Sequence, residues 1–299
     1  MNERMDVTFA SAGETCAGWW YEAPGAGPHP VVVMGHGLGG TRELGLDPYA
    51  RRFQAAGISV LAFDYRHYGR STGEPRELLS VSRQLADFRA AITYARTRSN
   101  VDGTRIAIWG SSFGGGHVMS LAAEELGLRA GVAQVPFSNG LASLLQIPIG
   151  TAIRVTFAAL LDMLRALLGL PPHYIALVGR PGEVALMSAA DSYDGYLQLV
   201  PPEAARAERW RNRVSARTGL AIPLYFPDRK LTRARIPVFV AVAEHDTIAP
   251  ASPTVRAAER TPSAQLARYP SGHFDYYQGD GFERVLNDEL TFLRAQLGL

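Results

Sequence analysis

A serine placed between glycines is the first feature of this sequence that could carry chemistry. The pentapeptide Gly110-Ser111-Ser112-Phe113-Gly114 follows the apolar run at residues 105–109 and precedes a helix-like segment. A G-x-S-x-G pattern between a strand and a helix is typical of a strained turn that exposes the serine hydroxyl at the edge of a sheet. Ser112 would lie near a helix N-terminus, where backbone N–H groups favour developing negative charge. The alternative is a glycine-rich turn in which the serine is incidental.

A nucleophilic serine needs a general base and an acid that orients this base. A serine hydroxyl is a weak nucleophile near neutral pH unless an adjacent histidine takes its proton. Of the seven histidines, His273 is the one that follows both Ser112 and a strand-end acid in the chain. That acid is Asp246, shortly after the apolar run at residues 238–242, and its alternative role is that of a helix N-cap. The residues therefore predict Ser112 as nucleophile, His273 as base and Asp246 as orienting acid.

The charge that develops on a substrate carbonyl oxygen needs two fixed hydrogen-bond donors. The backbone N–H of Phe113, directly after the serine, is one predicted donor, and the glycine-rich loop at residues 35–40 offers the N–H of Leu38 as the other. This loop lacks the glycine and lysine spacing of nucleotide-binding loops. No set of cysteines and histidines has the spacing of a metal site. We therefore expect neither a cofactor nor a metal.

Apolar runs alternate with helix-like segments over the first 135 residues. Predicted strands lie at residues 7–9, 19–21, 31–34, 58–63, 105–109 and 129–135, with helices at 49–56 and 78–98; further strands follow at 238–242 and 266–269, and further helices at 253–260 and 282–297. This alternation predicts a doubly wound α/β fold with a mostly parallel sheet and helices on both faces. Ligands bind such sheets outside the carboxyl ends of the strands, where both Leu38 and Ser112 are expected.

Residues 137–235 lie between the sixth and seventh predicted strands and are too many for a loop. Residues 141–170 are nearly all apolar, but a proline, a glycine and three charged residues interrupt them, so we expect no membrane span. We expect an inserted helical cap whose apolar surface is buried against the catalytic domain, another subunit or a ligand. If the cap roofs the site, the predicted lining residues are Leu144, Leu145, Ile149, Ile153 and Phe157.

Composition narrows the remaining classes of function. Thirty Lys and Arg residues against 28 Asp and Glu residues give a net charge of +2, which does not favour nucleic acid as a partner. The single cysteine, Cys16, excludes an internal disulfide and suits a reducing compartment, so we expect a cytoplasmic protein. Arg206, Arg209, Arg213 and Arg217 recur at helical spacing, which predicts a solvated helix face, with an anionic-substrate site as the alternative.

Five motifs together resemble the α/β-hydrolase family over almost the whole chain. They are His36-Gly37-Leu38-Gly39-Gly40, Asp64-Tyr65-Arg66-His67-Tyr68-Gly69-Arg70-Ser71, Gly110-Ser111-Ser112-Phe113-Gly114-Gly115, Glu244-His245-Asp246 and Gly272-His273-Phe274. The resemblance implies Ser112, Asp246 and His273 as a catalytic triad. The paired serines and the residues around His273 are similar to the dienelactone-hydrolase-like and acyl-peptidase-like branch, which includes esterases and some polyketide acyltransferases. His67 stands where the family commonly has glycine, which affects no catalytic position.

The expected organisation is a catalytic domain at residues 1–136 and 236–299 with the cap at residues 137–235. The expected function is that of a serine hydrolase that cleaves esters or thioesters of an apolar small molecule through an acyl-enzyme. Two alternatives remain open: an acyltransferase that delivers the acyl group to an alcohol, and a catalytically inactive ligand-binding protein of the same fold. A homodimer is one arrangement that would bury the apolar surface of the cap.

Overall fold

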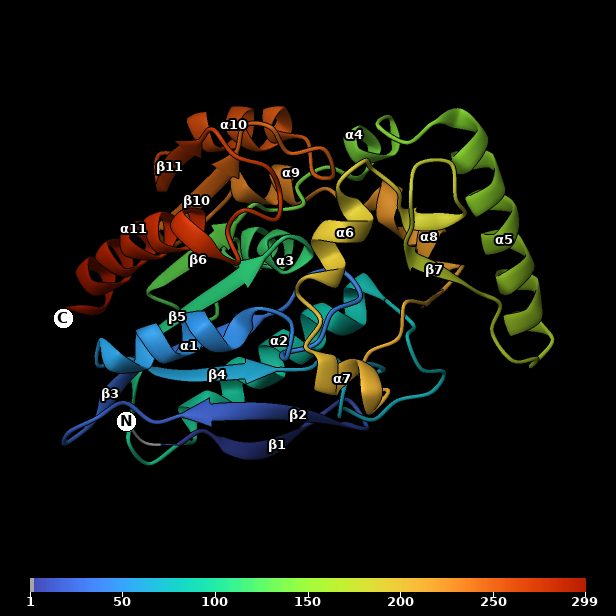
Figure 1. Ribbon diagram of the computed structural model, residues 1–299. Coiled ribbons are helices and arrows are strands. Elements are labelled where there is room, and N and C mark those ends of the chain that lie inside the picture. Colours follow the sequence, from blue (N-terminus) through green and yellow to red (C-terminus); the bar gives the residue numbers. More distant parts are fainter. Residues whose placement is uncertain (1–2) are drawn as a thin grey trace.

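One eight-stranded sheet organises the chain in this computed structural model, which describes residues 3–299 (Figure 1). The strands are β1 (Met5–Ser11), β2 (Glu14–Tyr21), β3 (His29–Gly35), β4 (Ser59–Phe63), β5 (Val101–Ser111), β6 (Ala130–Gln134), β10 (Val238–Ala243) and β11 (Ala264–Tyr269). Their order across the sheet is β1-β2-β4-β3-β5-β6-β10-β11. The β1–β2 and β2–β4 pairs are antiparallel, and the other neighbours are parallel. The predicted doubly wound, mostly parallel sheet is confirmed.

Helices cover both faces of this sheet. The helices α1 (Leu46–Ala55) and α11 (Gly279–Leu297) pack on one face, and α2 (Val81–Arg96), α3 (Phe113–Leu121) and α10 (Ala251–Glu259) pack on the other. Successive side chains of a strand point to opposite faces, so the continuous apolar run in β3 serves both layers. Val31 and Val33 pack with α2 and α3, whereas Val32 and Met34 pack with α1 and α11.

Between β6 and β10 the chain leaves the sheet and forms an insertion, residues 137–235. It contains α4 (Gly140–Leu144), α5 (Ile149–Leu167), β7 (Tyr174–Val178), β8 (Ala185–Met187), α6 (Ser192–Leu197), α7 (Pro202–Arg206), β9 (Val214–Ser215), α8 (Thr218–Ala221), the 3-10 turn η1 (Ile222–Leu224) and α9 (Pro227–Leu231). Besides the helices, three of these elements form a second sheet in the order β8-β7-β9, which the sequence did not predict. These strands are too short to show a sequence period. Within residues 3–299, no helix has the length and apolar content to cross a bilayer.

The insertion is tied to the sheet by ion pairs that the sequence did not reveal. Helix α7 ends at Arg206, and the arginines that follow do not share a helix face. Arg209 lies 2.8 Å from Glu43, and Arg213 lies 3.0 Å from Glu77. The prediction of a solvated helix face is therefore wrong: carboxylates on the loops after β3 and β4 hold these guanidinium groups.

A buried aspartate holds α5 within the insertion. The Asp162 side chain is fully buried. Its Oδ1 accepts the N–H of His173 at 2.8 Å, and its Oδ2 accepts the hydroxyl of Ser215 at 2.5 Å and the N–H of Arg217 at 2.9 Å. The Arg217 guanidinium lies 3.5 Å from the same oxygen. A buried charge without a partner costs free energy of folding. The Asp162 carboxylate therefore holds the segments that carry His173, Ser215 and Arg217 in place against α5.

We predict that Asp162→Ala destabilises the protein by roughly 3–5 kcal/mol, since it leaves three donors unsatisfied and one guanidinium without its charge partner. Urea unfolding of the purified variant measures this loss. Asp194→Ala is the matched control, because Asp194 also belongs to the insertion and pairs with Arg180 at 3.0 Å, but at the surface. That substitution is expected to cost less than about 1 kcal/mol. Equal losses in the two variants would contradict the anchoring role of Asp162.

Candidate active site

The turn between β5 and α3 presents Ser112 in an unusual backbone conformation. Strand β5 ends at Ser111, helix α3 begins at Phe113, and Ser112 between them has a φ of 55°. The glycines on both sides of this turn are required because there is no room for a side chain at either position. A Cβ atom on Gly110 would lie 2.2 Å from the carbonyl oxygen of Gly114, and one on Gly114 would lie 2.4 Å from the carbonyl oxygen of Gly35. The turn is thus wedged between its own helix and the end of β3.

The structure brings Ser112, His273 and Asp246 together at the carboxyl ends of β5, β11 and β10. The Nε2 atom of His273 lies 3.0 Å from Oγ of Ser112, and its Nδ1 atom lies 2.6 Å from Oδ2 of Asp246. The other oxygen of Asp246 accepts the N–H groups of Ile248 and Ala249 at 2.8 and 2.7 Å. Two backbone bonds therefore fix the carboxylate and leave one oxygen facing the imidazole.

The surroundings of His273 set its proton affinity. The His273 and Asp246 side chains are only 4 % and 2 % exposed. Burial by itself lowers the pKa of His273, but the charge and hydrogen bond of Asp246, with the charge of Asp191, outweigh it and raise the pKa above its ordinary value. An imidazole with a raised pKa accepts a proton readily, which suits a general base for the Ser112 hydroxyl.

Two backbone donors lie beside Ser112 without partners. The N–H groups of Leu38 and Phe113 make no hydrogen bond to any described residue, and both residues line the same cavity as Ser112. The loop that carries Leu38 is close to the serine, since a Cβ atom on Gly37 would lie 3.2 Å from Cβ of Ser112. His36 stabilises this loop by donating from Nδ1 to the carbonyl oxygen of Gly37 at 2.9 Å. These donors can bind an oxyanion formed next to Ser112.

Side chains of the insertion hold the other side of this loop. The hydroxyl of Tyr196 donates to the carbonyl oxygen of Leu38 at 2.8 Å, and the indole N–H of Trp210 donates to the carbonyl oxygen of Gly39 at 3.1 Å. The insertion therefore orients the peptide groups of the loop, a role for Tyr196 and Trp210 that no sequence pattern indicated.

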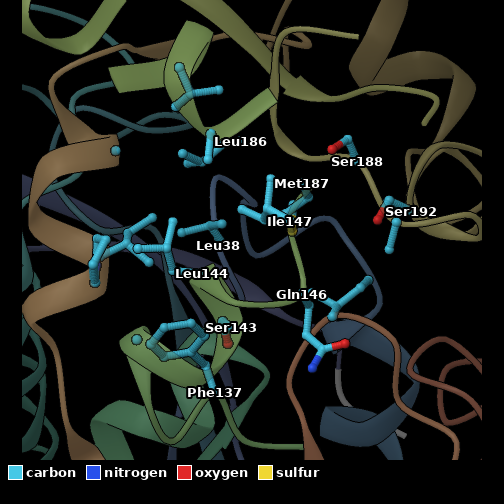
Figure 2. Close-up of a pocket in the computed structure, with 18 of the residues that line it drawn as sticks. Leu38, Phe137, Ser143, Leu144, Gln146, Ile147, Leu186, Met187, Ser188 and Ser192 are labelled. Carbon is cyan, nitrogen blue, oxygen red and sulfur yellow. The ribbon is translucent and has the colours of Figure 1, made fainter. Parts of the chain in front are cut away.

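A cavity of about 200 Å³ lies between the insertion and the serine turn (Figure 2). Its apolar lining includes Leu38, Phe113, Phe137, Leu144, Ile147, Val155, Leu186, Met187, Leu220, Ile222 and Ile248. Among residues 3–299, no charged residue lines it. The hydroxyl groups of Ser143 and Ser192 are buried at its wall without a hydrogen-bond partner in the described chain. The cavity therefore suits an uncharged, mainly apolar group that carries few polar atoms.

Of the five insertion residues expected to line this cavity, only Leu144 does so. Leu145, Ile149, Ile153 and Phe157 lie on the outer surface, with exposed fractions between 55 % and 77 %. The prediction is wrong for these four residues. The sequence shows that one face of the helix is apolar, but it does not show which face turns inward.

The inner face of α5 is made of smaller side chains. Ala152, Val155 and Thr156 line the cavity, and Ala159 is fully buried behind them. Residues of β8 and of the segment after α4 also line the cavity. No pattern in the sequence distinguishes them, so the sequence did not predict this. Small residues that alternate with the large apolar ones in residues 149–160 were the one usable signal for the inner face.

A smaller compartment of about 30 Å³ lies on the other side of Ser112. It is lined by His36, Gly37, Leu38, Gly40, Leu44, Leu46, Ser111, Ser112, Met187, Tyr196, Leu199, His273, Phe274 and Tyr277. The hydroxyl of Ser111 points toward Tyr277, with the two oxygens 2.6 Å apart, and accepts the side-chain N–H of Gln134 at 3.0 Å. Ser111 is therefore engaged, whereas Ser112 faces the imidazole. Within residues 3–299 no group of three His, Cys, Asp or Glu side chains is arranged to hold a metal ion.

Comparisons with other proteins identify the family of this chain. A family model described as serine aminopeptidase, S33, matches residues 26–168. The quorum-quenching protein AidA of Acinetobacter baumannii is 41 % identical over 97 % of this chain and 94 % of that protein. A thiohydrolase of Eupenicillium brefeldianum is 25 % identical over 99 % of this chain and 95 % of that protein.

A solved structure of an α/β hydrolase is similar to this protein over the whole fold. The crystal structure of the α/β hydrolase GrgF from Penicillium sp. sh18 superposes with a TM-score of 0.82 at 25 % identity and covers 100 % of both chains. The Penicillium sp. sequence named polyketide transferase grgF is 27 % identical over 98 % of this chain and 97 % of that protein.

We predict that a fluorophosphonate probe, which reacts with activated serine hydroxyls, labels Ser112. The Ser112 hydroxyl has a neighbouring base, and the Ser111 hydroxyl does not. Mass spectrometry of the labelled peptide should find the adduct in the wild type and not in Ser112→Ala. Ser111→Ala is the matched control and should retain most of the labelling. An adduct on the Ser112→Ala variant would contradict the assignment.

We predict a pH limit on the rate of this labelling. Only neutral His273 can accept the serine proton, so a raised pKa places the loss of rate at a pH above the ordinary histidine value of about 6.5. In Asp246→Asn the opposing burial remains, so the pKa falls and the limit moves to lower pH. The rate above the limit should fall roughly a thousandfold or more.

Asp191→Asn is the control for this pH dependence. It removes a weaker charge that also raises the pKa of His273, so the limit should move down by a smaller amount with most of the rate retained. A limit that stays in place in Asp246→Asn would show that Asp246 does not govern the imidazole.

Proposed function

Since this chain belongs to the α/β-hydrolase family, we propose that it is a serine hydrolase that cleaves carboxylic esters or thioesters of an apolar small molecule. The observation that carries the proposal is the contact chain from Ser112 through His273 to Asp246 at the floor of an uncharged cavity. In this proposal residues 1–136 and 236–299 form the catalytic domain, and the insertion, residues 137–235, forms the cap.

The first half of the reaction forms an acyl-enzyme. Oγ of Ser112 attacks the substrate carbonyl carbon while its proton passes to Nε2 of His273 over the observed 3.0 Å contact. Asp246 stabilises the imidazolium that results. The N–H groups of Leu38 and Phe113 bind the oxyanion. The bond to the leaving alcohol or thiol then breaks, and His273 returns the proton to the departing oxygen or sulfur.

The second half releases the acid. A water molecule gives a proton to Nε2 of His273 and attacks the acyl carbon, and the imidazolium then protonates Oγ of Ser112 as the acyl bond breaks. The same donors bind the second oxyanion. The reaction therefore consumes one water for each ester or thioester and needs no cofactor.

The lining of the two compartments selects the substrate class. In the described part of the chain, no Asp or Glu side chain lines either compartment, so the ammonium group of a peptide N-terminus would be buried without a partner. This argues against the aminopeptidase activity that the description of the matching family model names. An uncharged acyl group fits the larger compartment, where the unpartnered hydroxyls of Ser143 and Ser192 can also bind an oxygen atom on it.

An acyltransferase is the second candidate, and the smaller compartment is the observation that favours it. A group bound beside His273 and Tyr277 would lie where water must approach the acyl-enzyme. An alcohol held there would take the acyl group in place of water. The relative named polyketide transferase supports this candidate, and the relative named thiohydrolase supports the hydrolase. The ratio of new ester to free acid, measured with added alcohols, distinguishes them.

We predict that kcat/KM for p-nitrophenyl esters rises from acetate through butyrate to hexanoate. Each methylene buried in the cavity is worth roughly 0.8 kcal/mol, which is about fourfold in kcat/KM. Ser112→Ala should lose up to about a million-fold in kcat on every ester. Steady-state kinetics across the series measures both effects, and a flat series would contradict an acyl-binding cavity.

A pair of neighbouring residues on α5 provides the matched control. Ala152 lines the cavity, so Ala152→Phe should fill part of it and move the optimum to shorter chains. The next residue, Ile153, is 55 % exposed on the outer surface, so Ile153→Phe adds a ring there without changing the chain-length profile. A shift in the Ile153→Phe profile would contradict the assignment of the inner face.

A further inference from the structure

Helix α5 lies at the outer edge of the insertion (Figure 1). It exposes a broad apolar face to solvent. Twelve large apolar side chains between residues 141 and 170 are at least 40 % exposed: Leu141, Leu145, Ile149, Ile153, Phe157, Leu160, Leu161, Met163, Leu164, Leu167, Leu168 and Leu170. Monomeric proteins rarely expose apolar patches larger than a few hundred Å². This face therefore calls for a partner.

The spacing of the exposed residues identifies the kind of partner. Ile153, Phe157, Leu160, Leu164 and Leu167 follow one another at intervals of 4, 3, 4 and 3 residues. This alternation averages 3.5 residues and is the pattern of a seam that packs against another helix. We call these five residues the seam. The buried residues of α5 lie opposite to it.

We propose that the seam packs against the seam of a second copy of this chain, with the two α5 helices antiparallel about a two-fold axis near Leu160. The seam residues have nearly the same spacing on both sides of Leu160. An antiparallel pair sets Ile153 against Leu167 of the other copy and Phe157 against Leu164 of the other copy. Such self-complementarity is what a two-fold interface requires. The helix dipoles are also opposed in this pair.

The area of the face matches a stable interface. At roughly 100 Å² for each half-exposed side chain of this size, the twelve residues present on the order of 1,000 Å² of apolar surface. A stable protein interface covers about 800 Å² of each partner. The face is therefore large enough for a dimer without any contribution from the catalytic domain.

The charges on α5 favour a protein partner over a lipid surface. Helices that lie on membranes carry lysines and arginines along a polar face next to the apolar one. In α5 the opposite face is buried in the insertion and includes Asp162. The guanidinium groups of Arg154 and Arg165 donate to carbonyl oxygens of Gly182 and Pro171 in the same chain. Helix α5 therefore carries only two cationic side chains and no lysine, fewer than a helix that binds anionic headgroups along a polar face.

Light scattering at micromolar concentration tests the dimer. The wild type should have twice the mass of the chain. Leu160→Glu should raise the dissociation constant by roughly a hundredfold or more, since two like charges would face each other at the axis. Leu164→Glu should also raise it, since it would bury a charge against Phe157 of the other copy. Met5→Glu is the matched control, because Met5 is also exposed but lies on β1. Circular dichroism checks that the variants are folded. A monomeric wild type, or a monomer that floats with lipid vesicles, would overturn the proposal.

Cross-linking tests the direction of the helices. The natural Cys16 is fully buried, so a cysteine at the seam is the reactive one. Leu160→Cys should form a covalent dimer with a short bismaleimide reagent. Ile153→Cys should not, because in the antiparallel pair the two copies of residue 153 lie about 21 Å apart along the axis, at 1.5 Å per residue. Equal cross-linking at both positions would overturn the antiparallel arrangement. None of these measurements depends on enzymatic activity.

Discussion

The positive φ of Ser112 is the constraint on which the rest of the candidate site depends. A non-glycine residue in such a conformation costs about 1–3 kcal/mol and persists only where its surroundings enforce it. Here β5 is paired on both sides, α3 begins one residue later, and the backbone of Gly114 presses against the end of β3. The rigid centre of the sheet thus holds the strain. The strained turn projects the hydroxyl toward His273 and keeps the Phe113 N–H beside it free.

The insertion completes the site through polar contacts with the loops of the sheet. Tyr196 and Trp210 hold the carbonyl groups of the Leu38 loop, and Arg209 reaches Glu43 in the segment that follows it. The cavity therefore belongs to both parts of the chain, and neither part forms it alone. Helix α5 connects the two roles of the insertion: its small inner residues line the cavity, and its large outer residues form the seam. Binding across the seam would brace one wall of the cavity.

The sheet and the contact of Ser112 with His273 and Asp246 were predictable, because the signals for them are local or follow from topology. Short apolar runs rich in β-branched residues, such as that of β3, are typical of strands covered on both faces. The glycine spacing around Ser112 specifies its turn residue by residue. The choice of His273 and Asp246 needed one more step, the convergence of parallel strands at their carboxyl ends, which brings residues distant in sequence to one edge. The order of the strands and of these residues along the chain was therefore sufficient to predict that they lie close together.

The insertion was decided by tertiary structure. Its sequence shows that α5 is apolar, and both a roof over the site and an interface between subunits were compatible with that composition. Which side chains turn inward depends on what the helix packs against, and Asp162 settles it by contacts with residues 11 to 55 positions away. Arg209 and Arg213 likewise find their carboxylates 166 and 136 residues earlier. The spacing of apolar residues along a sequence shows that a helix has two different faces. Only contacts with residues distant in sequence determine which of the two is buried.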